Sequence, residues 1–138
     1  MIKEGLRVAF ANPTRLPRVV DSAGLTVDSK SIPPGSIVGV SAHSLLLNRS
    51  VFHNPQKFEP ERWSNPSPEM IRDSVMFGVG ERQCIGRDLA TAELFWAIDA
   101  IVRKDVLRGA RTVKSKIEIV EWFNSKVKGG KIELVWDG

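Results

Sequence analysis

The stretch from Ile85 to Lys104 most constrains how this chain can fold, because its apolar residues are spread around the whole helix that it predicts. On a helix with 3.6 residues per turn, the apolar residues of this stretch cover nearly the whole circumference. They are leucine, isoleucine, valine, alanine, phenylalanine and tryptophan. Only a narrow polar stripe remains, formed by Asp88, Thr91, Asp99 and Arg103. A helix that is apolar on almost every side must be buried among other elements. The rest of the chain offers it too few partners.

Those other elements are short. Residues 1–10 place Ile2, Leu6 and Phe10 at a spacing of four, which predicts a helix that ends at Asn12 and Pro13. From residue 19 to 47 we expect short β segments, "RVV", "LTV" and "SIVGVSAHSLLL", with turns at "DSAG" and "IPPG". The proline-rich "HNPQKFEPERWSNPSPE" predicts an irregular connection. Near the end, "KIEIVEWF" and "KIELVW" flank "NSKVKGG", whose adjacent glycines suit a hairpin turn.

Length and composition indicate one soluble unit. The 138 residues, 42% of them hydrophobic, are enough for a core. The single cysteine, Cys84, excludes an intramolecular disulfide and a zinc site built from several cysteines. Neither a signal peptide nor a run of about 18 apolar residues occurs, so we expect a soluble intracellular chain with no membrane segment.

The net charge of +4 is unevenly spread. Residues 103–131 carry nine lysines and arginines, against only Asp105, Glu118 and Glu121. A nucleic-acid surface would place stacking aromatics among such charges, and only Trp122 and Phe123 intervene. We therefore expect no nucleic-acid partner, and interpret the basic region as a solvated face or a surface for an acidic partner.

Cys84 lies in "FGVGERQCIG", at the start of the apolar helix. A lone cysteine is most often a small buried apolar residue. Here the unpaired N–H groups and the positive end of the helix dipole would stabilise a thiolate, which makes Cys84 a candidate nucleophile or metal ligand. Gly78 and Gly80 permit backbone conformations closed to other residues, and Gly86 removes a side chain one turn into the helix. Arg82 adds a fixed cation, so the segment suits a planar, anionic, metal-bearing cofactor.

The same ten residues resemble the cysteine loop of the cytochromes P450, whose pattern is Phe-x-x-Gly-x-Arg-x-Cys-x-Gly. Every fixed position matches, at Phe77, Gly80, Arg82, Cys84 and Gly86. Two further segments resemble the family in the same order. "EGLR" matches its Glu-x-x-Arg helix, and "PERW" matches the segment ahead of the cysteine loop. The resemblance extends over essentially the whole chain.

The Glu-x-x-Arg and "PERW" segments imply a structural network. Glu4 and Arg7 are three residues apart, share a helix face and can pair. As an isolated surface pair they would contribute a few tenths of a kcal/mol. In the family the matching pair is buried and joined by an arginine, here Arg62, so the loss of one partner would cost roughly 3–5 kcal/mol.

For the cysteine loop the resemblance implies a haem b site. Cys84, as thiolate, would be the axial iron ligand and the catalytic residue, donating electron density that favours cleavage of the O–O bond of dioxygen. Arg82 would bind a haem propionate, and Arg18, in "RLPRVV", matches a second propionate cation. Phe77 would pack beside the sulfur, and Ala90 would face the porphyrin. The implied cofactor-binding residues are Arg18, Phe77, Gly78, Gly80, Arg82, Cys84, Ile85, Gly86 and Ala90.

The resemblance also implies how much of the family's fold is present. A complete member is several times longer, and its oxygen-activating distal side precedes the Glu-x-x-Arg helix. We therefore expect residues 1–138 to form one partial domain, the C-terminal, proximal-haem portion of a mainly α fold with small β-sheets. It would run from the Glu-x-x-Arg helix through the cysteine loop and the long helix to a terminal β-hairpin. The segments "RLPRVV" and "QCIGRDLATAEL" resemble those of fungal members.

Two principal functions remain open. In the first, the chain carries the proximal part of a haem-thiolate monooxygenase, which inserts one oxygen atom from dioxygen into a small organic substrate. Its electrons would come from an NADPH-dependent reductase or another donor, and a longer parent could be anchored on the endoplasmic reticulum. In the second, the chain lacks the distal half and is a non-catalytic haem-binding or interaction fragment. A peroxide-driven enzyme is a third alternative, for which no candidate distal acid is evident.

Overall fold

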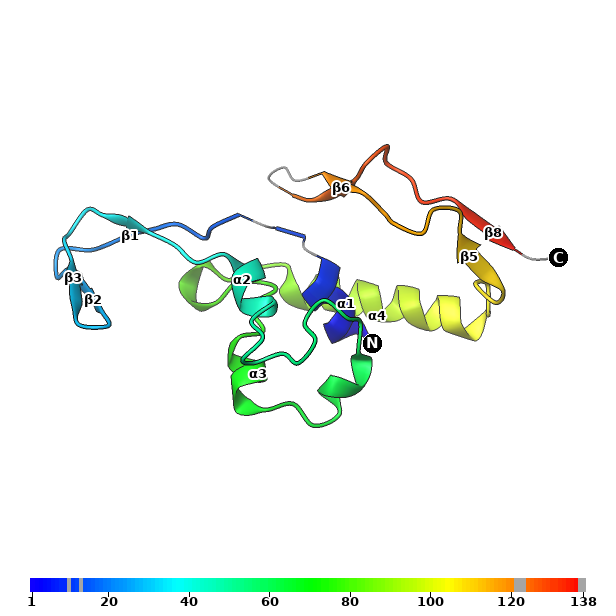
Figure 1. Ribbon diagram of the computed structural model, residues 1–138, viewed down its shortest axis with the longest axis horizontal. Coiled ribbons are helices and arrows are strands. Elements are labelled where there is room, and N and C mark those ends of the chain that lie inside the picture. The colour runs from blue at the N-terminus through cyan, green and yellow to red at the C-terminus, as the bar shows by residue number, and fades with distance from the viewer. Residues whose placement is uncertain (10, 13, 121–123, 137–138) are drawn as a thin grey trace.

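The computed structural model describes residues 1–9, 11–12, 14–120 and 124–136. Along the chain, α1 is followed by a group of very short strands, then by the other helices, and then by a second group of very short strands; the longest element is α4 (Arg87–Arg103) (Figure 1). The other helical elements are α1 (Ile2–Ala9), α2 (Ala42–Leu46), the 3-10 helix η1 (Pro60–Trp63), α3 (Pro68–Arg72) and the 3-10 helix η2 (Gly80–Arg82). The strands are β1 (Arg18–Val19), β2 (Leu25–Val27), β3 (Lys30–Ile32), β4 (Ile37–Val38), β5 (Ala110–Thr112), β6 (Ile119–Val120), β7 (Lys126–Val127) and β8 (Leu134–Trp136).

The strands form antiparallel pairs instead of one sheet. In the described residues β1 pairs with β4, β2 with β3, β5 with β8, and β6 with β7. The β2–β3 hairpin lies at one end of the molecule and the β5–β8 pair at the other (Figure 1). Isolated two-stranded pairs are marginally stable in water, so these hairpins depend on what packs against them.

The apolar core is small and lies between α2 and the segment that follows α3. Ala42 and Leu46 pack there with Val75, and the half-buried Leu45 and Met76 cover them. A second buried centre surrounds α1, where Phe52 is fully buried beside charged groups. A chain with so few buried apolar residues gains little hydrophobic stabilisation.

The first predicted helix is confirmed, but the interpretation of residues 41–47 as β structure is wrong. The chain turns at the extended residue Ser41 and forms α2, in which Leu47 N–H donates to the His43 carbonyl at 3.0 Å. Its leucines satisfy the β pattern equally well, and packing against Val75 decides in favour of the helix.

The proline-rich connection is more regular than we expected. It contains η1 and α3, and both have proline in the first turn, where no backbone N–H is needed. Ser67 caps α3 by accepting the Met70 N–H at 3.2 Å. The sequence "SPEM" is a helix start, with a capping serine followed by proline.

The predicted C-terminal hairpin pairs differently from our expectation. "KIELVW" does not pair with "KIEIVEWF": within the described residues β6 pairs with β7, and β8 pairs back to β5. Gly129 and Gly130 have φ values of 81° and 73°, so they do form a turn, but it leads from β7 toward β8. Residues 121–123 of the predicted strand lie outside the described residues.

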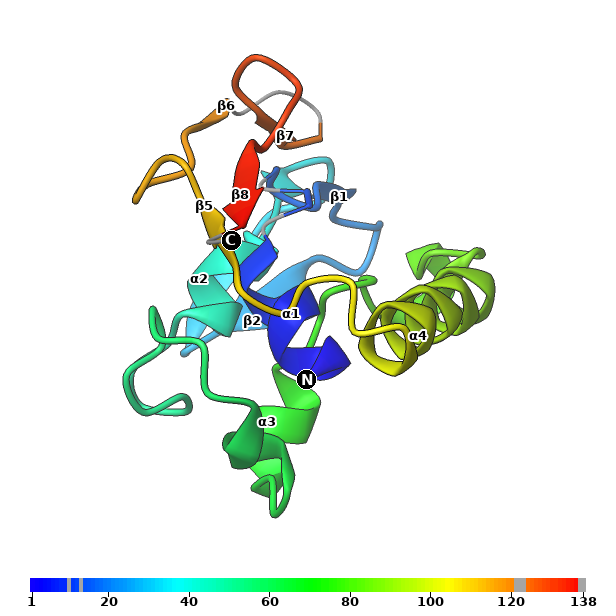
Figure 2. The ribbon, with the colours of Figure 1, turned by 90° about the vertical axis from the view of Figure 1, so that its right-hand side faces the viewer.

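The long helix is confirmed, and it is exposed. None of the residues of α4 is buried, and the side chains of Phe95 and Trp96 are 58% and 70% exposed. Figure 2, which shows α4 nearly end-on, places the other labelled elements to one side of it. The shortage of partners noted in the sequence is therefore a property of the structure. No helix in the described residues has the length and apolar character needed to cross a membrane.

Candidate functional site

The cysteine loop, residues 77–86, is closed by its own backbone. The Cys84 N–H donates to the Phe77 carbonyl at 2.8 Å, and the Gln83 N–H donates to the Gly80 carbonyl at 3.0 Å. At the loop's start the Gly78 N–H donates to the Val75 carbonyl at 2.9 Å. These bonds fold the segment into a compact turn that presents Cys84 just ahead of α4.

Two glycines make this turn possible. Gly78 and Gly80 have φ values of 73° and 71°, in the left-handed region that favours glycine. The third glycine differs from our expectation, because α4 begins at Arg87 and Gly86 therefore caps the helix instead of lying one turn inside it. A Cβ added to Gly86 would meet the Cys84 sulfur at 3.9 Å, an ordinary contact.

Cys84 is exposed, so it is not the buried apolar residue that a lone cysteine most often is. Ile85 is fully exposed, and Leu89 is 66% exposed one turn along. Ala90 is half-buried, and its N–H donates to the Gly86 carbonyl at 2.8 Å. Cys84, Ile85 and Leu89 are therefore all open to solvent.

Two arginines were predicted to contribute positive charge. Arg82 is exposed and forms no ion pair or hydrogen bond through its side chain within the described part of the chain. Arg18 is exposed on β1, and its guanidinium donates to the neighbouring Pro17 carbonyl at 2.8 Å. Phe77 and Ala90 belong to one continuous segment of the chain, but within the described residues no hydrogen bond or ion pair connects Arg18 to that segment.

These residues suit the haem that the family resemblance implies. An exposed thiol beside exposed apolar side chains matches a flat, largely apolar ligand that bears a metal. An arginine without a carboxylate partner, Arg82, is available to an anionic group. The described residues hold no cluster of three histidine, cysteine, aspartate or glutamate side chains that could bind a metal ion.

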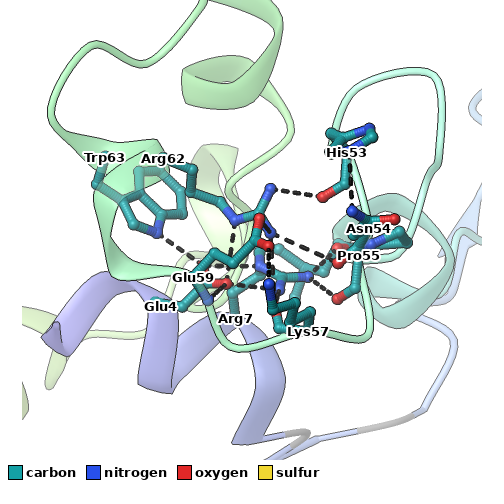
Figure 3. Close-up of polar contacts among 10 residues, drawn as sticks. Glu4, Arg7, His53, Asn54, Pro55, Lys57, Glu59, Arg62 and Trp63 are labelled. Atoms are coloured by element: carbon teal, nitrogen blue, oxygen red, sulfur yellow. Dashed lines mark hydrogen bonds and ion pairs between the residues drawn. The ribbon is translucent and has the colours of Figure 1, made fainter.

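The predicted network around α1 is present and buried (Figure 3). Arg7 donates to both carboxylate oxygens of Glu4, from Nε to Oε2 at 2.9 Å and from Nη2 to Oε1 at 2.8 Å. Neither side chain is exposed at all. Arg62 Nε donates to Glu4 Oε1 at 3.0 Å, which confirms the third member.

Arg7 also holds three chain segments together. Its Nη1 donates to the carbonyls of Leu46 at 2.9 Å and Pro55 at 2.6 Å, and its Nη2 donates to the Lys57 carbonyl at 3.2 Å. Sequence reasoning missed these acceptors because backbone carbonyls leave no residue signature. A buried guanidinium has five N–H donors that need acceptors. This requirement alone could have indicated that Arg7 binds more groups than the Glu4 carboxylate.

Glu4 accepts four sets of donors in total. Besides the arginines, Trp63 Nε1 donates to Oε2 at 2.8 Å and the Glu59 N–H donates to Oε1 at 3.0 Å. Burial raises the pKa of Glu4, but the hydrogen bonds from Arg7, Glu59 and Trp63 outweigh it and bring the pKa to about 2. The carboxylate is therefore ionised in the folded chain at neutral pH.

Sequence reasoning also missed the role of Trp63, which the motif alone marks only as an aromatic position. A tryptophan withdrawn from water normally finds an acceptor for its indole N–H, and this rule could have suggested the contact. Its ring lies 6.2 Å from that of Phe52, centroid to centroid, and Lys3 Nζ lies 5.7 Å from its centroid. Trp63 thus connects η1 to α1.

Comparison with known proteins agrees with this arrangement. Residues 1–110 match the family model described as cytochrome P450. A cytochrome P450 monooxygenase of the fungus Annulohypoxylon moriforme is 42% identical over 145 residues, covering 99% of this chain and 29% of the relative. The fusicoccadiene C-8 hydroxylase of Alternaria brassicicola is 38% identical over 101 residues, covering 72% of this chain and 19% of the relative.

The fold agrees as well. The solved structure of CYP105P2 from Streptomyces peucetius, in complex with a biphenyl compound, superposes with a TM-score of 0.76 at 22% identity. The alignment covers 98% of this chain and 32% of that one. The chain thus spans less than a third of the length of these relatives. The cysteine loop, the buried Glu4–Arg7–Arg62 network, the matched family model and the shared fold agree, and the chain belongs to the cytochrome P450 family.

Proposed function

We propose that this chain supplies the proximal, thiolate-bearing side of a haem-thiolate monooxygenase. The observation that carries the proposal is the exposed Cys84 thiol, held at the N-terminal end of α4 by a loop that its own backbone closes. Family membership supports the haem cofactor. When bound, haem b would supply the iron at which dioxygen is activated for transfer of one oxygen atom to an organic substrate.

Cys84 would bind the iron as a thiolate, and the loop would stabilise that charge. In the described residues the N–H groups of Ile85 and Gly86 have no acceptor, so both are available to the sulfur. Hydrogen bonds to a ligating sulfur tune the potential of its metal. The Phe77 carbonyl, which accepts the Cys84 N–H at 2.8 Å, fixes the ligand's backbone.

The other predicted residues would seat the ring. Ile85 and Ala90 would pack against the flat apolar face, and Arg82 would pair with a propionate. Gly78, Gly80 and Gly86 would allow the backbone to approach the ring closely, and Phe77 would shield the sulfur from water. Arg18 would bind the second propionate after exchanging its bond to the Pro17 carbonyl, which any exposed arginine can do at little cost.

The whole reaction requires partners that this chain does not itself contain. We propose a small organic substrate and electrons from an NADPH-dependent reductase or a similar donor, acting inside the cell. The relative from Alternaria brassicicola is named as a hydroxylase of fusicoccadiene, which is an insertion of oxygen of the proposed kind. The chain covers 29% of the Annulohypoxylon relative and 32% of the Streptomyces structure, and the proposed reaction would also use the parts of the family fold outside those shares.

A second candidate is a haem-binding or interaction fragment without catalysis. The exposure of α4 favours it, because a site built on a helix without buried residues is poorly fixed. The two candidates share Cys84 and differ in whether the bound metal reacts.

The first experiment is reconstitution of the chain with haem, followed by the carbon monoxide difference spectrum of the reduced form. A strongly red-shifted Soret band is expected for thiolate ligation, and Cys84→Ala should abolish it. Gln83→Ala is the matched control, because Gln83 is an exposed neighbour whose side chain makes only one 3.5 Å contact. A band that survives in Cys84→Ala would refute the assignment of the ligand. A thiolate band without turnover after addition of a reductase and substrate would favour the second candidate.

A further inference from the structure

A cavity of about 300 Å³ lies between the two C-terminal strand pairs, away from the cysteine loop. Residues 113–118 form one wall and residues 128–133 the other, and these two segments connect β5–β8 to β6–β7 (Figure 1). The Val113 N–H donates to the Glu133 carbonyl at 3.0 Å at one end, and the Lys128 N–H donates to the Glu118 carbonyl at 2.9 Å at the other. The opening is therefore framed by backbone at both ends.

Apolar side chains line this cavity although it opens to water. Ile117 and Ile132, one from each wall, are 41% and 49% exposed, and Val113 is 52% exposed. The half-buried Val127 contributes from β7. A ligand that covered these side chains would remove apolar surface from water, which is favourable.

Positive charge surrounds the apolar lining. Four lysines line the cavity, against two glutamates, Glu118 and Glu133. Both glutamates are already paired, with Lys128 at 2.7 Å and with Lys131 at 2.6 Å. Lys114 and Lys116 form no ion pair within the part of the chain that the structure describes. The cavity therefore has two available cations beside an apolar interior.

We propose that this cavity binds an amphipathic organic anion, a carboxylate on an aliphatic body of medium length. The carboxylate pairs with Lys114 and Lys116, and the aliphatic body covers Ile117 and Ile132. Exposed ion pairs are individually weak, so neither a bare anion nor an uncharged chain satisfies both halves of the cavity. The volume lies at the lower end of the roughly 300–1,000 Å³ that small-molecule pockets occupy, which favours a single short chain. This site is independent of haem and of the proposed oxygenation.

The test is titration of the 138-residue chain with decanoate, followed by calorimetry and by the amide shifts of ¹⁵N-labelled protein. Acetate and inorganic phosphate test the charge alone, and 1-decanol tests the aliphatic body alone. The double variant Lys114→Gln/Lys116→Gln should weaken decanoate binding roughly 3- to 30-fold, because it removes two exposed ion pairs. Lys30→Gln/Lys104→Gln is the matched control, with two exposed lysines removed elsewhere.

Saturable decanoate binding with shifts in residues 113–118 and 128–133, lost in the first double variant and kept in the control, supports the proposal. Equal binding of phosphate or of decanol would overturn it, since one half of the site would then suffice. Shifts confined to residues 87–103 would also overturn it, because they would mean adsorption to the exposed face of α4. Ile117→Ala/Ile132→Ala provides a second variant set, expected to weaken decanoate but not acetate.

Discussion

At the scale of single residues, the indole N–H of Trp63 donates a hydrogen bond that a phenyl ring cannot replace. Trp63→Phe keeps the ring beside Phe52 but removes the 2.8 Å bond to the Glu4 carboxylate. Hydrogen bonds to charged groups contribute about 1.5–3 kcal/mol, and Glu4 retains its other donors, so we expect a loss of about 1–2 kcal/mol. Urea unfolding monitored by circular dichroism measures this change.

Trp96→Phe is the control for this prediction, because Trp96 is 70% exposed on α4. It should leave the unfolding midpoint nearly unchanged. Equal effects of the two variants would contradict the role assigned to the indole N–H of Trp63.

The ionisation of Glu4 makes stability depend on pH. Its pKa is lowered from 4.5 to about 2 in the folded chain, so its contribution is fully present above about pH 5 and is lost as the pH falls toward 2. A shift of this size corresponds to about 3 kcal/mol between neutral and strongly acidic pH. Stability measured by urea unfolding from pH 7 to pH 2 should fall accordingly.

Glu4→Gln should be less stable at pH 7, because it leaves Arg7 and Arg62 without their buried counter-charge. It should also show a flatter pH profile below pH 5. Glu61→Gln, an exposed change in η1, should keep the steep profile. A Glu4→Gln profile as steep as that of the unmodified chain would mean that other carboxylates carry the acid sensitivity.

At the scale of elements, the β2–β3 hairpin contains a correctable strain. Its turn residues Asp28 and Ser29 have φ values of 47° and 63°, a conformation that costs an ordinary residue roughly 1–2 kcal/mol. Ser29→Gly should therefore slow hydrogen exchange in Leu25–Ile32, by up to about tenfold for 1.4 kcal/mol. Ser31→Gly, inside β3, should speed it, because glycine weakens a strand. Identical responses of the two variants would contradict the assigned turn.

Elements built from local signals could be predicted from the sequence, and those that depend on distant partners could not. α1, α4 and the cysteine loop follow from periodicity and from a motif of ten consecutive residues. α2 could not be distinguished from a strand, because its leucines fit both patterns until they pack against Val75. The pairing of β8 with β5 was missed because it joins residues about 24 apart in the chain, whereas the double glycine suggested a local hairpin.

The candidate site likewise contains features set by local sequence and features set by distant partners. Cys84 and Gly80 are fixed positions of the ten-residue motif, and the backbone bonds that close their loop, Cys84 N–H to the Phe77 carbonyl and Gln83 N–H to the Gly80 carbonyl, are made within it. The bonds from Trp63 and from the Glu59 N–H to Glu4 connect residues more than 50 apart, and nothing in the sequence specifies which atoms meet. Motifs thus identify the members of a network, while the fold determines its bonds.

At the scale of the whole molecule, the most prominent feature is the apolar face that α4 exposes to solvent. Patches of this kind promote association. We expect the 138-residue chain to self-associate as its concentration rises. Phe95→Glu/Trp96→Lys adds one charge of each sign at two exposed aromatic positions of that face and should shift sedimentation toward the monomer. Glu93→Gln, an exposed polar change on the same helix, should not.

The same double variant separates the roles of α4 and of the cysteine loop. Phe95 and Trp96 lie more than two helical turns beyond the start of α4, so their replacement leaves the loop's backbone bonds in place. Haem reconstitution of the variant should therefore still give the thiolate band, from a chain that stays in solution at higher concentration. If the band disappears while circular dichroism shows α4 intact, the apolar face itself contributes to the haem site, and the assignment of that site to residues 77–90 is too narrow.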